Sequence, residues 1–258
     1  MAKKEKANKT EKTVKYHRRR GGILYAAVAV VLIAASLVAA CTVFFRVESV
    51  TVEGNERYST EEILSVASVE MGANMILTPS QQIADAVTSA LPYVDQVEVQ
   101  KRFPTTVNLV ITECQPVAVI TGAASAWVID AKGKLLEQAD ETLAQTYPPV
   151  TGLELLEPEQ GALAQTTLEN QDKLEGLVAF TTALQSCGLM EGVTAIDISS
   201  NTEIVMTYED RLTVKVLNNV DFDRKLKALK QVIAVVGEDA RGTINMKGTD
   251  DIIYSPES

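Results

Sequence analysis

One uncharged segment limits what this chain can fold into. Residues 21–45 contain no Asp, Glu, Lys or Arg. As a helix the segment would extend about 37 Å, more than the roughly 30 Å of a bilayer's hydrocarbon core. It is apolar on all sides, whereas a helix that lies on a membrane surface has one polar face. The sequence therefore predicts a transmembrane helix over 21–45 and excludes an ordinary soluble enzyme.

The charges on either side of this segment predict its orientation. Residues 1–20 hold nine Lys and Arg against two Glu, although the whole chain has a net charge of -10. Lys15, Arg18, Arg19 and Arg20 adjoin the N-terminal end of the segment, and positive charge is retained in the cytoplasm. We therefore expect a basic cytoplasmic tail with no core of its own, with binding of nucleic acid or anionic lipid as the minor alternative.

The apolar segment has two alternative interpretations, a cleaved signal peptide and a lipidation signal. A cleaved signal peptide has a shorter apolar stretch of about 7 to 15 residues and a small-residue cleavage site, whereas this segment ends in the bulky Phe44 and Phe45. The stretch from Leu37 to Cys41 resembles a bacterial lipobox, but the apolar sequence continues beyond it. We expect an uncleaved anchor and keep lipidation of Cys41 as the minor alternative.

The composition of residues 46–258, the region expected outside the membrane, excludes several enzyme classes. His17 is the only histidine and lies in the tail, so the outer region cannot form a Ser/His/Asp, Cys/His or histidine-zinc site. Cys114 and Cys187 are expected to be free and buried, although they could pair. No glycine-rich phosphate loop is present. We predict no catalytic, metal-binding or cofactor-binding residue and no enzyme activity, and an anchored hydrolase that uses carboxylates is the remote alternative.

The first part of the outer region shows a regular succession of strand and helix signals. A half-buried strand is predicted over 47–53, and a helix over 60–67 begins with the capping box of Ser59 and Glu62. A second helix over 79–91 begins at Pro79. Two alternating segments form a hairpin over 97–113. This order predicts a small sheet that two helices cover on one face.

A set of motifs in this part resembles a known domain. The motifs, in chain order, are Val50-x-Val52-x-Gly54-Asn55-x-Arg57-Tyr58-Ser59-x-Glu61-Glu62-Ile63, Gly72-x-Asn74, Leu91-Pro92-Tyr93-Val94, Val97-x-Val99-x-Lys101-Arg102-x-Pro104-x-Thr106-Val107 and Glu113-x-Gln115-Pro116-Val117-Ala118. Together they resemble the POTRA domain of the FtsQ/DivIB family of bacterial cell-division proteins. A single copy directly after a membrane helix is the layout of that family, whereas other POTRA domains usually occur in tandem.

The remaining sequence predicts a second domain. Its first half is expected to contain a hairpin over 127–136, a segment at 148–153 that is similar to one in the FtsQ/DivIB family, and a surface loop over 154–170. Its second half is expected to contain a helix from Leu174 that ends at Gly188, strands over 204–208 and 212–217, a helix over 222–236, and two short strands over 242–247 and 251–254. The helix over 222–236 could form a coiled-coil seam with a partner, but packing on its own sheet is the favoured interpretation.

The predicted fold class is α+β. It comprises one N-terminal transmembrane helix, a POTRA domain of order β-α-α-β-β and a mixed α/β domain that ends in a short strand pair. The boundaries we expect are 1–20 for the cytoplasmic tail, 21–45 for the helix, 46–114 for the POTRA domain, 115–254 for the extracytoplasmic β domain and 255–258 for a C-terminal tail.

The resemblance also implies a function. It implies a non-enzymatic scaffold of the division machinery that links FtsL-like and FtsB/DivIC-like proteins to the septal peptidoglycan synthases. Such a protein crosses the cell membrane once, is enriched at the division septum, and needs no cofactor, nucleic acid or small-molecule substrate. The alternative is a POTRA-containing export chaperone or secretion component that binds extended polypeptides.

The last predicted strand contains the candidate partner-binding residues Ile252, Ile253 and Tyr254. A terminal strand is often an edge strand, whose unpaired backbone groups can accept a strand from another chain, and the resemblance implies that use. By alternation, Ile252 and Tyr254 point to one face and Ile253 to the other, without indicating which set meets a partner. Alternatively, all three only complete the domain's own sheet. We expect Ile253→Pro or Ile253→Lys to weaken capture of the FtsB/DivIC-like partner in a folded domain.

Overall fold

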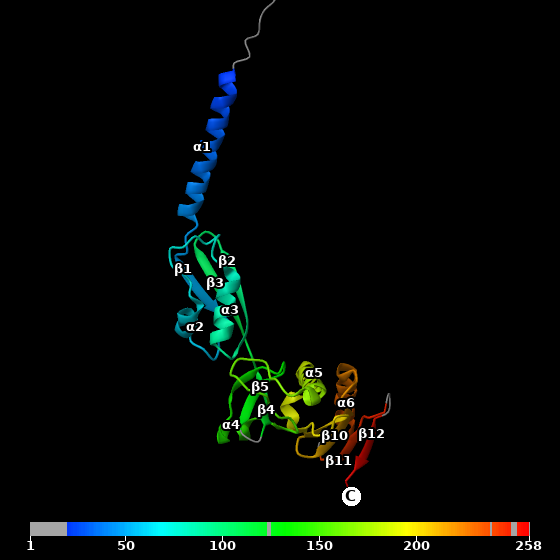
Figure 1. The fold of residues 1–258 in the computed structure, drawn as a ribbon. Helices are drawn as coiled ribbons and strands as arrows, with labels where there is room; N and C mark the ends of the chain where they lie inside the picture. The colour runs from blue at the N-terminus through cyan, green and yellow to red at the C-terminus, as the bar shows by residue number, and fades with distance from the viewer. Residues whose placement is uncertain (1–19, 123–124, 238, 249–251, 258) are drawn as a thin grey trace, which may run out of the picture.

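The chain forms an extended helix followed by two domains (Figure 1). The computed structural model describes residues 20–122, 125–237, 239–248 and 252–257. Helix α1 (Arg20–Phe44) projects from the first domain, and its side chains from Leu24 onward are largely exposed. By length and composition, Leu24–Phe44 can cross a membrane. Arg20 begins this helix, while Lys15, Arg18 and Arg19 lie outside the described residues.

The first domain is a three-stranded sheet with two helices. The strands lie in the order β1-β3-β2, with β1 parallel and β2 antiparallel to β3. The helices bury Ile63, Ala67, Ile83 and Val87 against the sheet, where Leu109 is fully buried. The bounds are β1 Ser49–Glu53, α2 Thr60–Ala67, α3 Ser80–Ala90, β2 Val94–Arg102 and β3 Thr106–Glu113.

The structure largely confirms the predicted starts of the two helices in this domain. The Ser59 hydroxyl accepts a hydrogen bond from the Glu62 N–H at 3.2 Å, and the Ser59 N–H donates to the Glu62 carboxylate at 2.8 Å. Both hydrogen bonds of the predicted capping box are therefore present. Pro79 is the N-cap of α3 rather than its first residue. After β1, Gly54 has a positive φ of 83°, and Asn55 donates a side-chain hydrogen bond to the Tyr58 carbonyl at 2.8 Å.

The described residues of the second domain form a nine-stranded mixed sheet. The strand order is β12-β11-β10-β9-β8-β7-β4-β5-β6, so β12 lies at one edge. Parallel pairs join β4 to β7, β7 to β8 and β10 to β11. The bounds are β4 Pro116–Thr121, β5 Ala126–Asp130, β6 Leu135–Gln138, α4 Glu141–Thr146, β7 Pro149–Thr151, α5 Gln171–Cys187, β8 Val193–Asp197, β9 Glu203–Tyr208, β10 Leu212–Leu217, α6 Phe222–Val236, β11 Gly242–Asn245 and β12 Ile253–Pro256.

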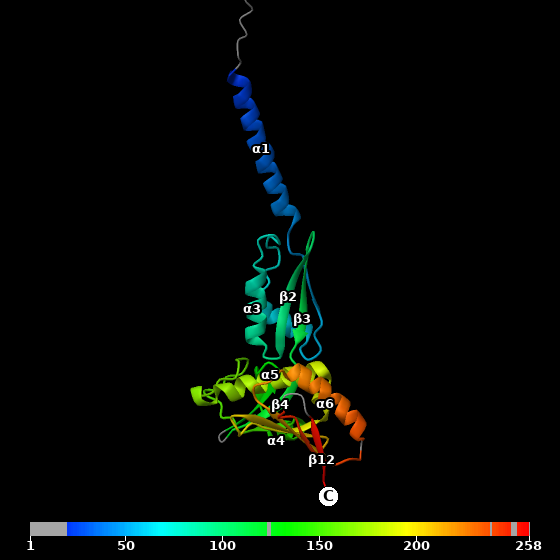
Figure 2. The ribbon, with the colours of Figure 1, turned by 90° about the vertical axis from the view of Figure 1, so that its right-hand side faces the viewer.

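Helices α5 and α6 cover one face of this sheet, as Figure 2 shows. Phe180 of α5 is fully buried and its ring lies 5.3 Å from that of Phe222, the first residue of α6. Leu226 and Leu229 follow at helical spacing and are also fully buried. The apolar stripe of α6 therefore packs on its own domain, as the favoured interpretation predicted.

The sequence-based expectation did not include the strands β4 and β8, the short helix α4 or the 3-10 helices Leu168–Asn170 and Met190–Gly192. It named the segment of β7 without predicting a strand there. The final strands were predicted in the right place but with the wrong limits, because β11 ends at Asn245 and β12 runs from Ile253 to Pro256. Both Cys114 and Cys187 are free thiols; Cys114 is buried as expected, but Cys187 is only partly buried.

Candidate functional site

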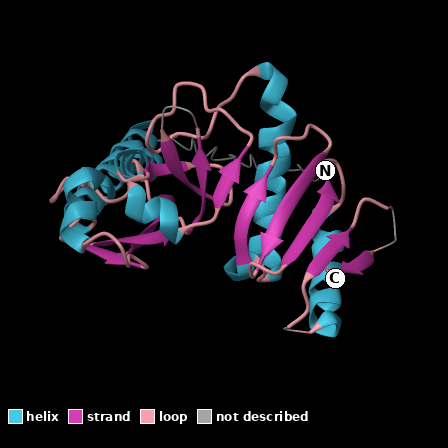
Figure 3. Cartoon of the chain, turned by 90° about the horizontal axis from the view of Figure 1, so that it is seen from below, coloured by secondary structure: helices cyan, strands magenta, loops and turns pink. Residues whose placement is uncertain are grey.

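The edge strand β12 is the candidate site for a partner. Figure 3 shows it at the end of the row of strands, and in Figures 1 and 2 it lies in the domain remote from α1. Tyr254 pairs with Ile244 and Ile253 with Asn245 in the antiparallel ladder with β11. Among the described residues no strand pairs with the other side of β12. The terminal strand is therefore an edge strand, as predicted.

The side chains of this edge divide between two faces. Ile252 and Tyr254 are partly buried and pack against the main core, under the face that the helices cover. The Tyr254 hydroxyl donates a hydrogen bond to the Arg241 carbonyl at 2.9 Å. Ile253 points to the opposite face and is 59% exposed. Of the three candidate residues, Ile253 is thus the one whose side chain is accessible to a partner.

Backbone hydrogen bonding shows which groups of the edge are unpaired. Glu257 donates its N–H to the Arg241 carbonyl of the neighbouring strand at 2.9 Å. Backbone groups alternate in direction along a strand, so those of Ile253 also face β11. The N–H and C=O groups of Tyr254 consequently face the open edge. Pro256 also faces outward but has no N–H to donate, which limits the length of strand that can be added there.

A buried junction joins the two domains. Tyr93, just before β2, is 4% exposed and packs with residues of β4, β5 and β6. Its hydroxyl donates to the Glu137 carboxylate, which also accepts a hydrogen bond from Arg57 at 3.1 Å. The Arg57 guanidinium lies 3.6 Å from the centre of the Tyr93 ring. Burial and the hydrogen bond to Glu137 raise the pKa of Tyr93 well above its usual value. No local pattern in the sequence indicates this junction.

A second polar cluster at the junction resembles a metal site only in composition. Potential ligand atoms of Asp95, Cys114 and Asp130 lie within 4.8 Å of one another. However, Lys132 places its ammonium 2.7 Å from the Asp95 carboxylate, and Asp130 accepts the N–H groups of Lys132 and Lys134. Burial raises the pKa of the Cys114 thiol to about 12, which disfavours the thiolate that binds metals. These residues hold the domains together and form no candidate metal centre.

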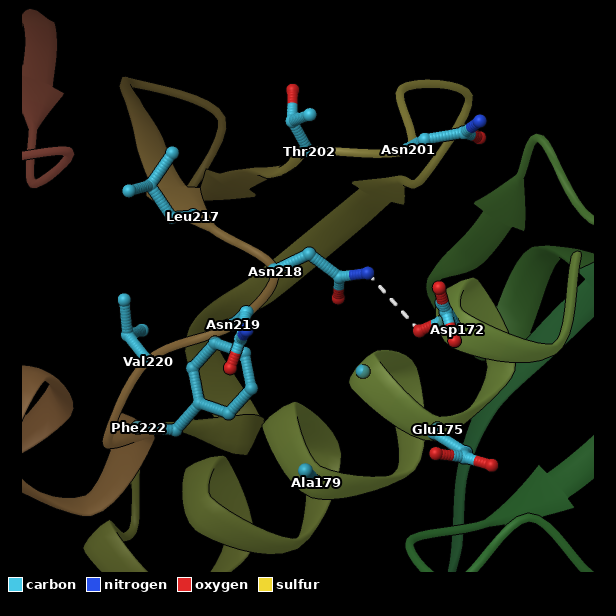
Figure 4. Close-up of a pocket in the computed structure, with 11 residues that line it drawn as sticks. Asp172, Glu175, Ala179, Asn201, Thr202, Leu217, Asn218, Asn219, Val220 and Phe222 are labelled. Carbon is cyan, nitrogen blue, oxygen red and sulfur yellow. Dashed lines mark hydrogen bonds between the residues drawn. The ribbon is translucent and has the colours of Figure 1, made fainter.

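A pocket of about 730 Å³ lies beside the N-terminal half of α5 (Figure 4). Asn218 crosses it and donates a hydrogen bond to the Asp172 carbonyl at 3.0 Å. The Asn218 Oδ1 is buried without a hydrogen-bond partner in the described structure and lies over Gly176, where a Cβ would approach it to 1.6 Å. The Thr202 hydroxyl of the lining pairs with the Ser200 hydroxyl at 3.2 Å, and the Glu175 carboxylate accepts a hydrogen bond from Gln171 at 3.1 Å, so the described lining residues show no hydrogen-bonded pair of nucleophile and base.

The fold and site define a class of protein. An apolar helix leads directly into a small β-α-α-β-β domain, followed by a larger domain with an open sheet edge. Residues 45–113 match the family model for a POTRA domain of the FtsQ type. The chain is thus a POTRA protein whose described residues include one candidate membrane span, before the first domain, and that first domain is its POTRA domain.

Comparison with curated proteins identifies the family. The chain is 29% identical over 191 residues to the cell division protein FtsQ of Geobacter sp. strain M21, a match that covers 73% of this chain and 67% of the relative. It is 22% identical over 238 residues to FtsQ of Syntrophotalea carbinolica, covering 87% and 80%. A third relative, the cell division protein DivIB of Clostridium acetobutylicum, is 26% identical over 94 residues, covering 36% and 37%. The chain belongs to the FtsQ/DivIB family of bacterial cell-division proteins.

Proposed function

We propose that this protein is a non-enzymatic scaffold of the division machinery, anchored by α1 and bound to a partner through β12. In this account the N-terminus is cytoplasmic and both domains lie outside the membrane. The partners are FtsL-like and FtsB/DivIC-like proteins, through which the scaffold connects to the septal peptidoglycan synthases. The observation that supports it most is an open strand edge with an exposed Ile253, in a chain whose relatives are named cell division proteins.

The anchor and the domain boundaries form part of the same proposal. The basic residues Lys15, Arg18, Arg19 and Arg20 precede α1, while the chain beyond it is strongly acidic. This asymmetry favours retention of the N-terminus in the cytoplasm. We assign residues 1–20 to a cytoplasmic tail, 21–45 to the transmembrane helix, 46–114 to the POTRA domain, 115–254 to the β domain and 255–258 to a C-terminal tail.

Imaging of an N-terminal fluorescent fusion in dividing cells tests the cellular role. The proposal predicts a band at the division site, because the tag would fold in the cytoplasm and follow the anchored protein. Even membrane fluorescence throughout the cell cycle would favour the export chaperone. A tag released into the cytoplasm would show that the anchor is processed, for instance at Cys41.

Capture of the FtsB/DivIC-like partner by purified variants tests the role of the edge. Burying an Ile side chain contributes about 1.5 to 3 kcal/mol, so Ile253→Lys should weaken binding by roughly tenfold or more. Leu168→Lys is the matched control, because Leu168 is 93% exposed on the same domain but belongs to the short helical turn before α5 and not to the sheet edge. Ile253→Pro is less informative than expected, since the Ile253 N–H faces β11 and its loss would disturb the domain's own sheet.

An export chaperone that binds extended polypeptides is the second candidate, because an open edge can pair with many sequences. The two functions differ in selectivity. A scaffold binds a defined partner, whereas a chaperone would bind unrelated unfolded chains with similar affinity. Competition with an unfolded, unrelated polypeptide separates them, and displacement of the partner at equal concentration would support the chaperone.

A further inference from the structure

The chain that leaves α1 is held tightly by the POTRA domain. The Phe45 carbonyl accepts the Met75 N–H at 2.9 Å, and the Val47 N–H donates to the Ala73 carbonyl at 3.0 Å. The Phe45 ring also makes an edge-to-face contact with the ring of Phe103, with 5.5 Å between centroids. The end of α1 is therefore fixed between the loop before α3 and the β2–β3 turn, without a flexible linker.

These same two segments expose apolar side chains. Leu77 is 79% exposed, Phe103 60%, Met71 59% and Ile76 50%. We call these four residues the membrane-proximal rim. Single exposed apolar residues are ordinary on protein surfaces, but four on two adjoining segments form a patch that indicates an interaction surface. Figures 1 and 2 show both segments at the end of the domain nearest α1.

The rim is fixed in place by hydrogen bonds. The Lys101 ammonium, on β2, donates to the Ile76 carbonyl at 3.2 Å and to the Thr78 carbonyl at 2.8 Å. This links the loop before α3 to the strand that leads into the Phe103 turn. The loop therefore cannot fold its apolar side chains back into the domain without losing these hydrogen bonds.

Continuity with the anchor indicates what covers the rim. Phe44, the last residue of α1, is 72% exposed, and one residue later Phe45 contacts Phe103 of the rim. Arg46 follows and is exposed, which suits a residue beside lipid phosphates. If α1 spans the bilayer, the rim meets the same bilayer where the helix leaves it. Aromatic and aliphatic side chains gain free energy by entering this interfacial layer.

We propose that the membrane-proximal rim inserts into the headgroup and upper acyl region of the outer leaflet, beside α1. The inference rests on the proposed transmembrane anchor and adds a second membrane contact. Because α1 is fixed to the POTRA domain, the domain follows any tilt of the helix in the bilayer, and the second contact restricts that tilt. Because the junction is buried, the orientation of the second domain and of β12 is restricted as well.

Tryptophan quenching by brominated lipids tests this proposal on the full chain. Trp127 is the only tryptophan, so Trp127→Phe provides a silent background. Single tryptophans are then introduced as Leu77→Trp and Phe103→Trp in the rim, Val38→Trp in α1 and Leu168→Trp as the exposed control. Each protein is reconstituted alone in phosphatidylcholine vesicles with or without bromine on the upper acyl chain. No partner protein is present, so only lipid can cover the rim.

We expect emission from the two rim tryptophans to fall by roughly twofold in brominated vesicles, as for any indole at the interface. The Leu168→Trp protein should be unaffected. Quenching of Val38→Trp without quenching of Leu77→Trp and Phe103→Trp would overturn the rim proposal while the anchor stands. Absence of quenching at Val38→Trp would overturn the anchor, and with it this inference. Unchanged protease resistance of each variant confirms that the domains remain folded.

Discussion

The Tyr93→Phe substitution would test the junction between the domains. It removes one hydroxyl that is buried and donates to the Glu137 carboxylate. A hydrogen bond to a charged group contributes about 1.5 to 3 kcal/mol, and the lower end applies here because the acceptor is partly exposed. We therefore expect the free energy of unfolding to fall by about 1.5 kcal/mol at pH 7.

Alkaline pH gives this prediction a second, independent readout. The pKa of Tyr93 is raised in the folded state, first by burial and then by the hydrogen bond to Glu137. Its stabilising contribution is complete below the unfolded pKa of about 10 and is lost as the pH rises above that value. The phenylalanine variant has no such proton to lose. The difference between the two proteins should therefore shrink above about pH 10, by up to about 1.4 kcal/mol per pH unit.

Urea unfolding of the detergent-solubilised full chain, followed by circular dichroism at several pH values, measures both effects. Tyr147→Phe is the matched control, because Tyr147 adjoins the same cluster and its hydroxyl makes no hydrogen bond with the described residues. We expect the control to change stability by less than about 0.5 kcal/mol. Equal effects of the two substitutions, or a difference that does not vary with pH, would refute the assignment of Tyr93 and Glu137 as the link between the domains.

Three further predictions concern the two domains that follow α1. Burial raises the pKa of the Cys114 thiol to about 12, so at pH 8 iodoacetamide should modify the partly buried Cys187 before Cys114; equal rates would contradict this. Hydrogen bonds from the Ser199 hydroxyl and N–H lower the pKa of Asp197, a contribution that exists above the unfolded pKa and is lost on acidification. The stability deficit of Ser199→Ala should therefore narrow below about pH 4, and a constant deficit in urea titrations would contradict it. Gly152→Ala should cost more than about 2 kcal/mol in the same assay, because φ is 91° and the new Cβ would lie 2.3 Å from the Ser199 nitrogen; wild-type stability would refute this.

Local signals in the sequence predicted the elements that depend on local contacts. The capping box of Ser59 and Glu62 forms as expected, because both partners lie within one helical turn. The strands predicted over 204–208 and 212–217 likewise form an antiparallel pair, which the turn of Glu209 and Asp210 joins with positive φ at both residues. In β10 the alternation of buried and partly buried residues follows the sequence pattern. Such features need no knowledge of distant segments.

The missed elements depend on contacts between distant segments. β4 is buried on both faces over most of its length, so the run from Val117 to Ile120 shows no alternation. Its parallel pairing with β7 joins segments with an α-helix and two strands between them, which no local pattern indicates. The direction of Ile253 was equally undetermined, because it depends on which sheet face α6 covers. The junction at Tyr93 and Glu137 joins residues 44 positions apart.

Photo-crosslinking from residue 253 in dividing cells tests the central claim most directly. A photoreactive amino acid replaces Ile253 in one strain and the more exposed Leu168 in a control strain. The account predicts one discrete adduct from position 253, with an FtsB/DivIC-like partner, and none from position 168. A protein that localises to the division site yet gives no discrete adduct from position 253, or gives the same adducts from both positions, would contradict β12 as the partner-binding edge.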